Sequence, residues 1–147
     1  MLSGGGAYLA VRTQIRSARA DAQVAAARSE VASVIGHGAA LQMLAQTRAY
    51  IIAHPYRTSW AGFDASGLLT ATATHSAELV RAAKQVRYLG NPPLLDACKA
   101  LTALIVSEPT DPKSAEAWAA WADQIGEAVV KLDDLLDATE PGGGVDD

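Results

Sequence analysis

Apolar residues recur every three or four positions along most of this chain, which is the spacing of one face of an α-helix. No proline interrupts this pattern between Tyr8 and Ala53. The pattern predicts one very long helix over this range, or two collinear ones. At 1.5 Å per residue, about 45 residues span roughly 70 Å, so we expect that part of the helix projects or that the helix breaks. The stripe consists of Tyr8, Val11, Ile15, Ala18 and Ala22, and of Ala20, Val24, Ala27, Val31, Val34, Gly38, Leu41, Ala45 and Ile52.

The weakest point of this long helix is the segment Gly36-His37-Gly38. Each glycine destabilises a helix by about 1 kcal/mol relative to alanine. The segment therefore predicts a kink, or a place where another helix packs closely.

Two further helices are marked by residues that start and stop helices. One runs from about Asp64 or Ala65 to Leu89, and Gly90 is its C-terminal stop. The next begins at Asn91, which is a good N-cap. Pro92 follows at the first helical position, where the backbone N–H that proline lacks would have no partner within the helix.

A fourth helix is predicted after Asp111-Pro112, which repeats the start signal, and it ends at Glu140-Pro141. The short connections between the later helices imply antiparallel neighbours. The sequence thus predicts an all-α protein, an antiparallel four-helix bundle with an over-long N-terminal helix. We expect a flexible segment over residues 1–7, one bundle domain over 8–138 and a flexible acidic tail over 139–147.

Composition supports helices and excludes some partners. Alanine accounts for 31 of 147 residues, which favours helix over sheet. The net charge of −4 does not favour nucleic acid as a partner. Residues 1–90 hold nine basic and four acidic side chains, whereas 91–147 hold three and twelve. Opposite charges can therefore meet across an antiparallel bundle and set the register of its helices.

Few residues indicate chemistry. The histidines His37, His54 and His75 lack the spacing of a metal site, and His75 is expected to be a hydrogen-bonded core or boundary residue. Cys98 is the only cysteine, and its position on an apolar face indicates a buried side chain rather than a nucleophile. Acid, base and nucleophile do not converge, so we expect no enzyme and no cofactor.

The connector from His54 to Phe63 holds several aromatic residues and allows two interpretations. Tyr56, Arg57, Trp60 and Phe63 either bind a partner, as residues of long loops often do, or cover the open end of the bundle. Elsewhere, Trp118 and Trp121 lie three apart on one helix face and are expected in the core.

The N-terminal segment is apolar up to Arg12. It is shorter than the roughly 20 apolar residues that a helix needs to cross a bilayer. Arg12, Arg16 and Arg19 then follow at the spacing i, i+4, i+7. They resemble the basic flank of a membrane anchor, or they form a solvated basic face. We therefore expect a cytoplasmic protein, with membrane contact through the N-terminus left open.

The segment Leu79–Pro93, continued through Asp96–Leu101, resembles a helical hairpin in uncharacterised alanine-rich helical proteins of actinobacteria and their phages. The glycine-rich start followed by an Arg/Ala-rich helix over Gly4–Arg28 is similar to them as well. The resemblance covers about half of the chain and implies a helical fold without a transferable activity.

These observations lead to one hypothesis of function and one alternative. The hypothesis is a non-enzymatic interaction module in which residues 8–34 contact another protein, a second copy of the chain or a membrane-proximal surface. The alternative is a small-ligand sensor with a pocket among His75, Trp60 and Trp118.

Overall fold

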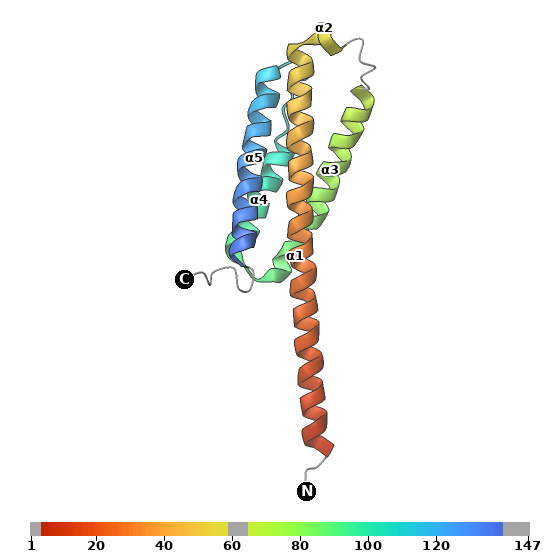
Figure 1. Cartoon of the computed structure of the whole chain (residues 1–147), viewed down its shortest axis with the longest axis vertical. Helices are drawn as coiled ribbons and strands as arrows, with labels where there is room; N and C mark the ends of the chain where they lie inside the picture. Colours follow the sequence, from red (N-terminus) through yellow and green to blue (C-terminus); the bar gives the residue numbers. More distant parts are fainter. Residues whose placement is uncertain (1–3, 59–64, 140–147) are drawn as a thin grey trace.

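The computed structural model describes residues 4–58 and 65–139, and these residues are helical apart from short connections (Figure 1). The elements in chain order are α1 (Gly4–Ala53), α2 (Pro55–Thr58), α3 (Ala65–Gln85), the 3-10 helix η1 (Val86–Leu89), α4 (Pro92–Val106) and α5 (Ala115–Ala138). The four longer helices run alternately up and down, and α1 packs against α3 and α5 while α4 packs mainly on α5 (Figure 1). The predicted all-α bundle with a long first helix is confirmed.

The first helix is unbroken over 50 residues, but only its second half belongs to the bundle. Ala27 is its first buried residue, and residues 6–26 are all exposed. We call residues 6–26 the stalk, and at 1.5 Å per residue it is about 30 Å long. Of the two predicted outcomes for an over-long helix, projection is the one that the structure shows (Figure 1).

The predicted domain limits change accordingly. The packed bundle begins at Ala27 rather than at residue 8, because Ala27 is the first buried residue of α1. Helix α1 begins at Gly4, so residues 4–7 are helical, whereas residues 1–3 lie outside the described part of the chain. Thr139 is the C-cap of α5, and the rest of the predicted tail, 140–147, is likewise outside it.

The core is built from apolar side chains of all four long helices. Its largest fully buried members are Trp118, Leu41, Leu79, Leu94, Leu101, Ile125 and Leu132. Burial of Cys98, Trp118 and Trp121 was expected from their helix faces and is confirmed. Five acidic residues of α5 are exposed: Glu116, Asp123, Glu127, Asp133 and Asp137.

The glycine segment of α1 is a site of close packing, and the helix continues through it. Gly38 is buried, and a Cβ atom on it would lie 2.6 Å from Cγ2 of Val129 in α5. A Cβ atom on Gly36 would have no neighbour within 4 Å. Gly38 therefore allows α1 and α5 to approach, while Gly36 lies on the solvent side.

The predicted turn between α3 and α4 is confirmed. Gly90 has a φ of 62°, the left-handed conformation that glycine adopts most readily. Asn91 then caps α4, because its side-chain oxygen accepts a hydrogen bond from the backbone N–H of Leu94 at 3.3 Å.

The fourth helix follows Asp111-Pro112, as predicted, but Asp111 is not its N-cap. Helix α5 begins at Ala115, and its N-cap is Ser114, whose hydroxyl oxygen accepts from the N–H of Ala117 at 3.1 Å. The carboxylate of Asp111 instead accepts from the N–H of Lys113 at 2.9 Å. Asp111 therefore stabilises a turn before the helix. Ser114 accepts a hydrogen bond from one of the backbone N–H groups that have no partner within the first turn of α5.

Replacing Ser114 with alanine is expected to lower the free energy of unfolding by about 1 kcal/mol, the usual effect of losing an N-cap side chain. Replacing Asp111 with alanine is the matched control and removes only a turn hydrogen bond, so its effect is expected to be smaller. Urea unfolding followed by circular dichroism measures both. A larger loss in Asp111→Ala than in Ser114→Ala would restore the original assignment of the cap.

The expectation that charge sets the register across the bundle is not supported. The ion pairs within the described residues join Arg81 to Glu78 at 3.0 Å and to Glu30 at 4.0 Å, all three from the basic half of the chain. Arg28 does reach the end of α5, but its guanidinium donates to the backbone carbonyl of Thr139. The pair between Arg81 and Glu30 links α3 to α1, and exposed ion pairs of this kind contribute little to stability.

Candidate functional site

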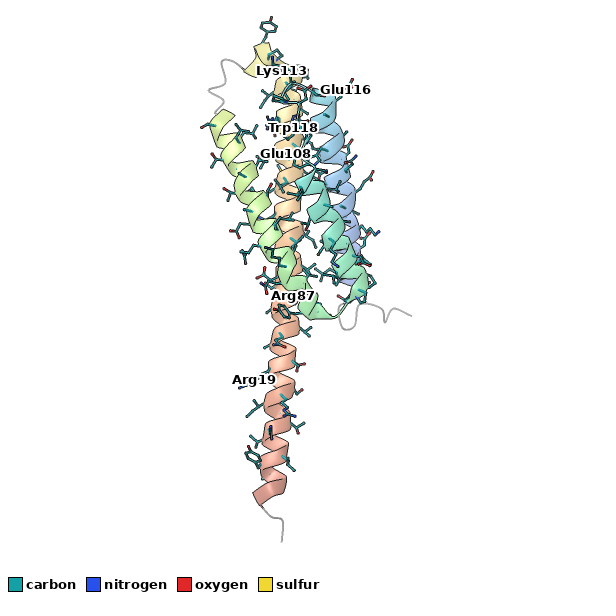
Figure 2. All side chains as sticks on the ribbon, turned by 180° about the vertical axis from the view of Figure 1, so that it is seen from behind. Arg19, Arg87, Glu108, Lys113, Glu116 and Trp118 are labelled. Atoms are coloured by element: carbon teal, nitrogen blue, oxygen red, sulfur yellow. The ribbon has the colours of Figure 1, made fainter. Side chains whose placement is uncertain are left out.

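The stalk carries three of the residues singled out from the sequence. Arg12, Arg16 and Arg19 are exposed, and Figure 2 shows Arg19 on the part of α1 that has no helix beside it. At their spacing of four and three residues, the three side chains lie along one side of the stalk. The structure thus brings these arginines together on a surface that the bundle leaves open.

Two apolar stripes run along α1, and the sequence pattern alone had joined them into one. The first stripe enters the core at Ala27, and its expected earlier members Ala20 and Val24 are exposed. The second stripe starts at Tyr8 and stays on the outside of α1 over its whole length. We call it the outer seam, and its members are Tyr8, Val11, Ile15, Ala18, Ala22, Ala25, Ser29, Ala32, Gly36, Ala39, Met43, Gln46 and Tyr50.

Every residue of the outer seam is exposed, and none of them is charged. The spacing alternates strictly between three and four residues, which is a heptad repeat. Tyr8 at one end is 65% exposed, and Met43 near the other is 68% exposed. A long exposed apolar row of this kind is typical of an interaction surface. The repeat of the outer seam is present in the sequence, but it can be separated from the core stripe only when the buried face of α1 is known.

Of the four predicted site residues in the connector, the structure describes the side chain of only one, Tyr56. Tyr56 lies in α2 at the end of the bundle and is 88% exposed (Figure 1). Arg57 is also in α2, but its side chain, like Trp60 and Phe63, lies outside what the structure describes. The choice between partner binding and covering the bundle therefore stays a prediction for these residues.

His75 has a hydrogen-bonded boundary position, as predicted, and its partner is His37. The Nδ1 atoms of the two rings lie 2.9 Å apart and link α1 to α3. A neutral imidazole has one donor and one acceptor nitrogen, so one ring donates and the other accepts. Within the described ranges no group of three or more His, Cys, Asp and Glu side chains is placed to hold a metal ion. The sequence did not indicate this pair, because 38 residues separate its members.

The remaining candidates for chemistry are held inside the bundle. Cys98 is 1% exposed, and burial raises the pKa of its thiol to about 11, so the unreactive thiol form is maintained at neutral pH. The rings of Trp118 and Trp121 pack edge to face at 5.5 Å. The indole N–H of Trp118 donates to the carbonyl of Asp111, and the guanidinium of Arg48 stacks on its ring at 3.9 Å. These contacts are those of structural residues.

Two surface grooves are candidates for small ligands. One of about 650 Å³ lies between α1 and α5 beside Gln42 and Gly126, and one of about 570 Å³ lies between α3 and α4 beside Lys84 and Leu95. Neither groove is lined by His75 or Trp118, the residues on which the sensor alternative relied.

No helix among the described residues combines the length and the apolar character needed to cross a membrane. Comparisons with protein-family models, with curated proteins and with solved structures give no significant match.

Proposed function

We propose that this chain is a non-enzymatic protein-interaction module and that the stalk is its contact element. The observation that carries the proposal is the continuation of α1 about 30 Å beyond the bundle, with every residue from 6 to 26 exposed. The exposed side chains of this extension are not part of the buried core of the bundle.

The energetics of a lone helix support a role in binding. Helical stability in proteins comes mostly from packing an apolar face, and isolated helices in water are marginal even at about 15 residues. The stalk exposes Tyr8, Val11 and Ile15, and burying a large apolar side chain stabilises by about 1.5–3 kcal/mol. A partner that covers these three residues would therefore both bind and order the stalk.

The charges of the stalk favour protein as the partner class. Its charged residues are Arg12, Arg16, Arg19 and Asp21, so only one side of the helix is basic. The chain as a whole carries a net charge of −4, which opposes binding to nucleic acid. We place the protein in the cytoplasm, and a membrane-proximal version of the proposal would use the same arginines against anionic lipids.

The proposal is tested by placing a photo-reactive phenylalanine analogue at Ile15 in the full chain, in the cells that make the protein. The matched control places the same analogue at Val130, which is also exposed but lies on α5. Discrete protein adducts are expected from position 15 and not from position 130. Equal labelling from both positions, or adducts with lipid alone, would contradict a protein-binding stalk.

A further inference from the structure

We infer that the partner of the outer seam is a second copy of this chain, laid antiparallel so that residues 8–39 of the two α1 helices pack together. The inference rests on the proposed function, since it names the partner of the stalk. It is carried by the spacing of the seam, by the sizes of its side chains and by the charges that flank it.

The seven-residue repeat of the seam is the repeat of a left-handed coiled coil. The buried residues of α1, such as Val31, Val34 and Leu41, fall at the third and sixth positions of each heptad when Tyr8 is given the first. The seam occupies the first and fourth positions, on the opposite side of the helix. Each copy therefore holds its own bundle on the side of α1 that faces away from the pair.

Side-chain sizes along the seam favour the antiparallel direction. The large residues Tyr8, Val11 and Ile15 occupy one end, and small residues occupy the middle. In an antiparallel pair centred between Ala22 and Ala25, these three face Ala39, Gly36 and Ala32 of the second copy. Each of these outer layers then joins one large and one small side chain, and the central layers, Ala18 with Ser29 and Ala22 with Ala25, join small residues, so no layer opposes two large side chains.

A parallel pair in register does not have this property. It would place Tyr8 against Tyr8 and Gly36 against Gly36 of the second copy. The helices would be held apart at one end and leave a gap at the other. Because interfaces are packed as densely as protein interiors, such a gap forfeits contact energy.

The flanking charges fit the same arrangement. With this centre, Asp21 lies opposite Arg28 of the second copy, and the two-fold axis makes the contact twice. Arg12 and Arg19 lie opposite Ser33 and Ala26, so no like charges meet. Arg28 already donates to the carbonyl of Thr139 in its own chain, and a guanidinium has further N–H groups for a carboxylate.

The overlap is long enough for a stable dimer. Residues 8–39 span about 47 Å at 1.5 Å per residue. Ten seam positions and the residues beside them amount to about 20 residues from each copy, which is within the usual size of a specific interface.

Sedimentation equilibrium of the full chain tests the dimer. A monomer–dimer equilibrium is expected, and Ile15→Glu is expected to weaken it at least about tenfold, since two carboxylates would enter the apolar interface. Leu9→Glu is the matched control, because Leu9 is also a large apolar residue exposed on the stalk but lies off the seam. A chain that stays monomeric, or a dimer insensitive to Ile15→Glu, would overturn the inference.

A charge exchange tests the register. Asp21→Arg is expected to weaken the dimer on the order of tenfold, because it replaces two exposed ion pairs by like charges. The double variant Asp21→Arg, Arg28→Asp is expected to recover most of the loss. A double variant that is weaker than either single variant would exclude this register.

Thiol cross-linking tests the direction. Chains with Ala18→Cys mixed with chains with Ser29→Cys are expected to form a mixed disulfide, since these positions face each other. Equal residues at position 18 are about 16 Å apart along the axis in this arrangement, but adjacent in a parallel pair. A disulfide between two Ala18→Cys chains would overturn the antiparallel direction. A monomeric chain whose position 15 still labels another protein would refute this inference and leave the proposed function standing.

Discussion

Replacing Trp118 with alanine is expected to lower the free energy of unfolding by about 3–5 kcal/mol, a large part of the roughly 5–15 kcal/mol that stabilises a domain of this kind. The side chain is 2% exposed and joins three parts of the structure. Its ring packs edge to face against Trp121 and stacks with the guanidinium of Arg48 of α1. Its indole N–H donates a hydrogen bond to the backbone carbonyl of Asp111 in the loop before α5. Its loss leaves a cavity and removes these contacts together.

Urea unfolding of monomeric protein measures this effect. Val130→Ala is the matched control on the same helix, because Val130 is exposed and its replacement is expected to change stability by no more than about 0.5 kcal/mol. A loss below about 1 kcal/mol in Trp118→Ala would mean that this residue does not anchor the core.

The second large effect is expected at Gly38. Alanine at either Gly36 or Gly38 gains the same helix propensity, about 1 kcal/mol. Only at Gly38 does the new methyl group meet a neighbour, Cγ2 of Val129 at 2.6 Å. Valine is branched at Cβ and has little freedom in a helix, so it cannot turn away.

We therefore expect Gly36→Ala to stabilise the chain and Gly38→Ala to be less stable than Gly36→Ala by about 1–3 kcal/mol, the usual effect of overpacking. Thermal and urea unfolding of the two variants as monomers gives this difference directly, since the propensity gain cancels. Equal stability would show that α1 and α5 separate easily at Gly38.

The long helices, the turn between α3 and α4 and most of the core faces were determined by the sequence alone. Proline and glycine act within one turn, so Gly90 and Asn91 mark the turn between α3 and α4 wherever that turn lies in the fold. The period of apolar residues likewise places Cys98 and Trp118 inward without knowledge of their neighbours. Ser114 was missed as a cap because serine and aspartate are equally good N-caps, and only the helix geometry chooses between them.

Only the tertiary structure decided which face of α1 is buried by the other helices and at which residue this burial begins. Helix α5 has 24 residues and α1 has 50, so the bundle can accompany about half of the first helix. Ala20 and Ala27 are the same residue on the same stripe, yet only Ala27 is buried, since the neighbouring helices end there. Pairing of His37 with His75 depends on the same packing. Local sequence sets the conformation of a segment, but burial depends on residues far away in the chain, and the exposed seam of α1 is the result.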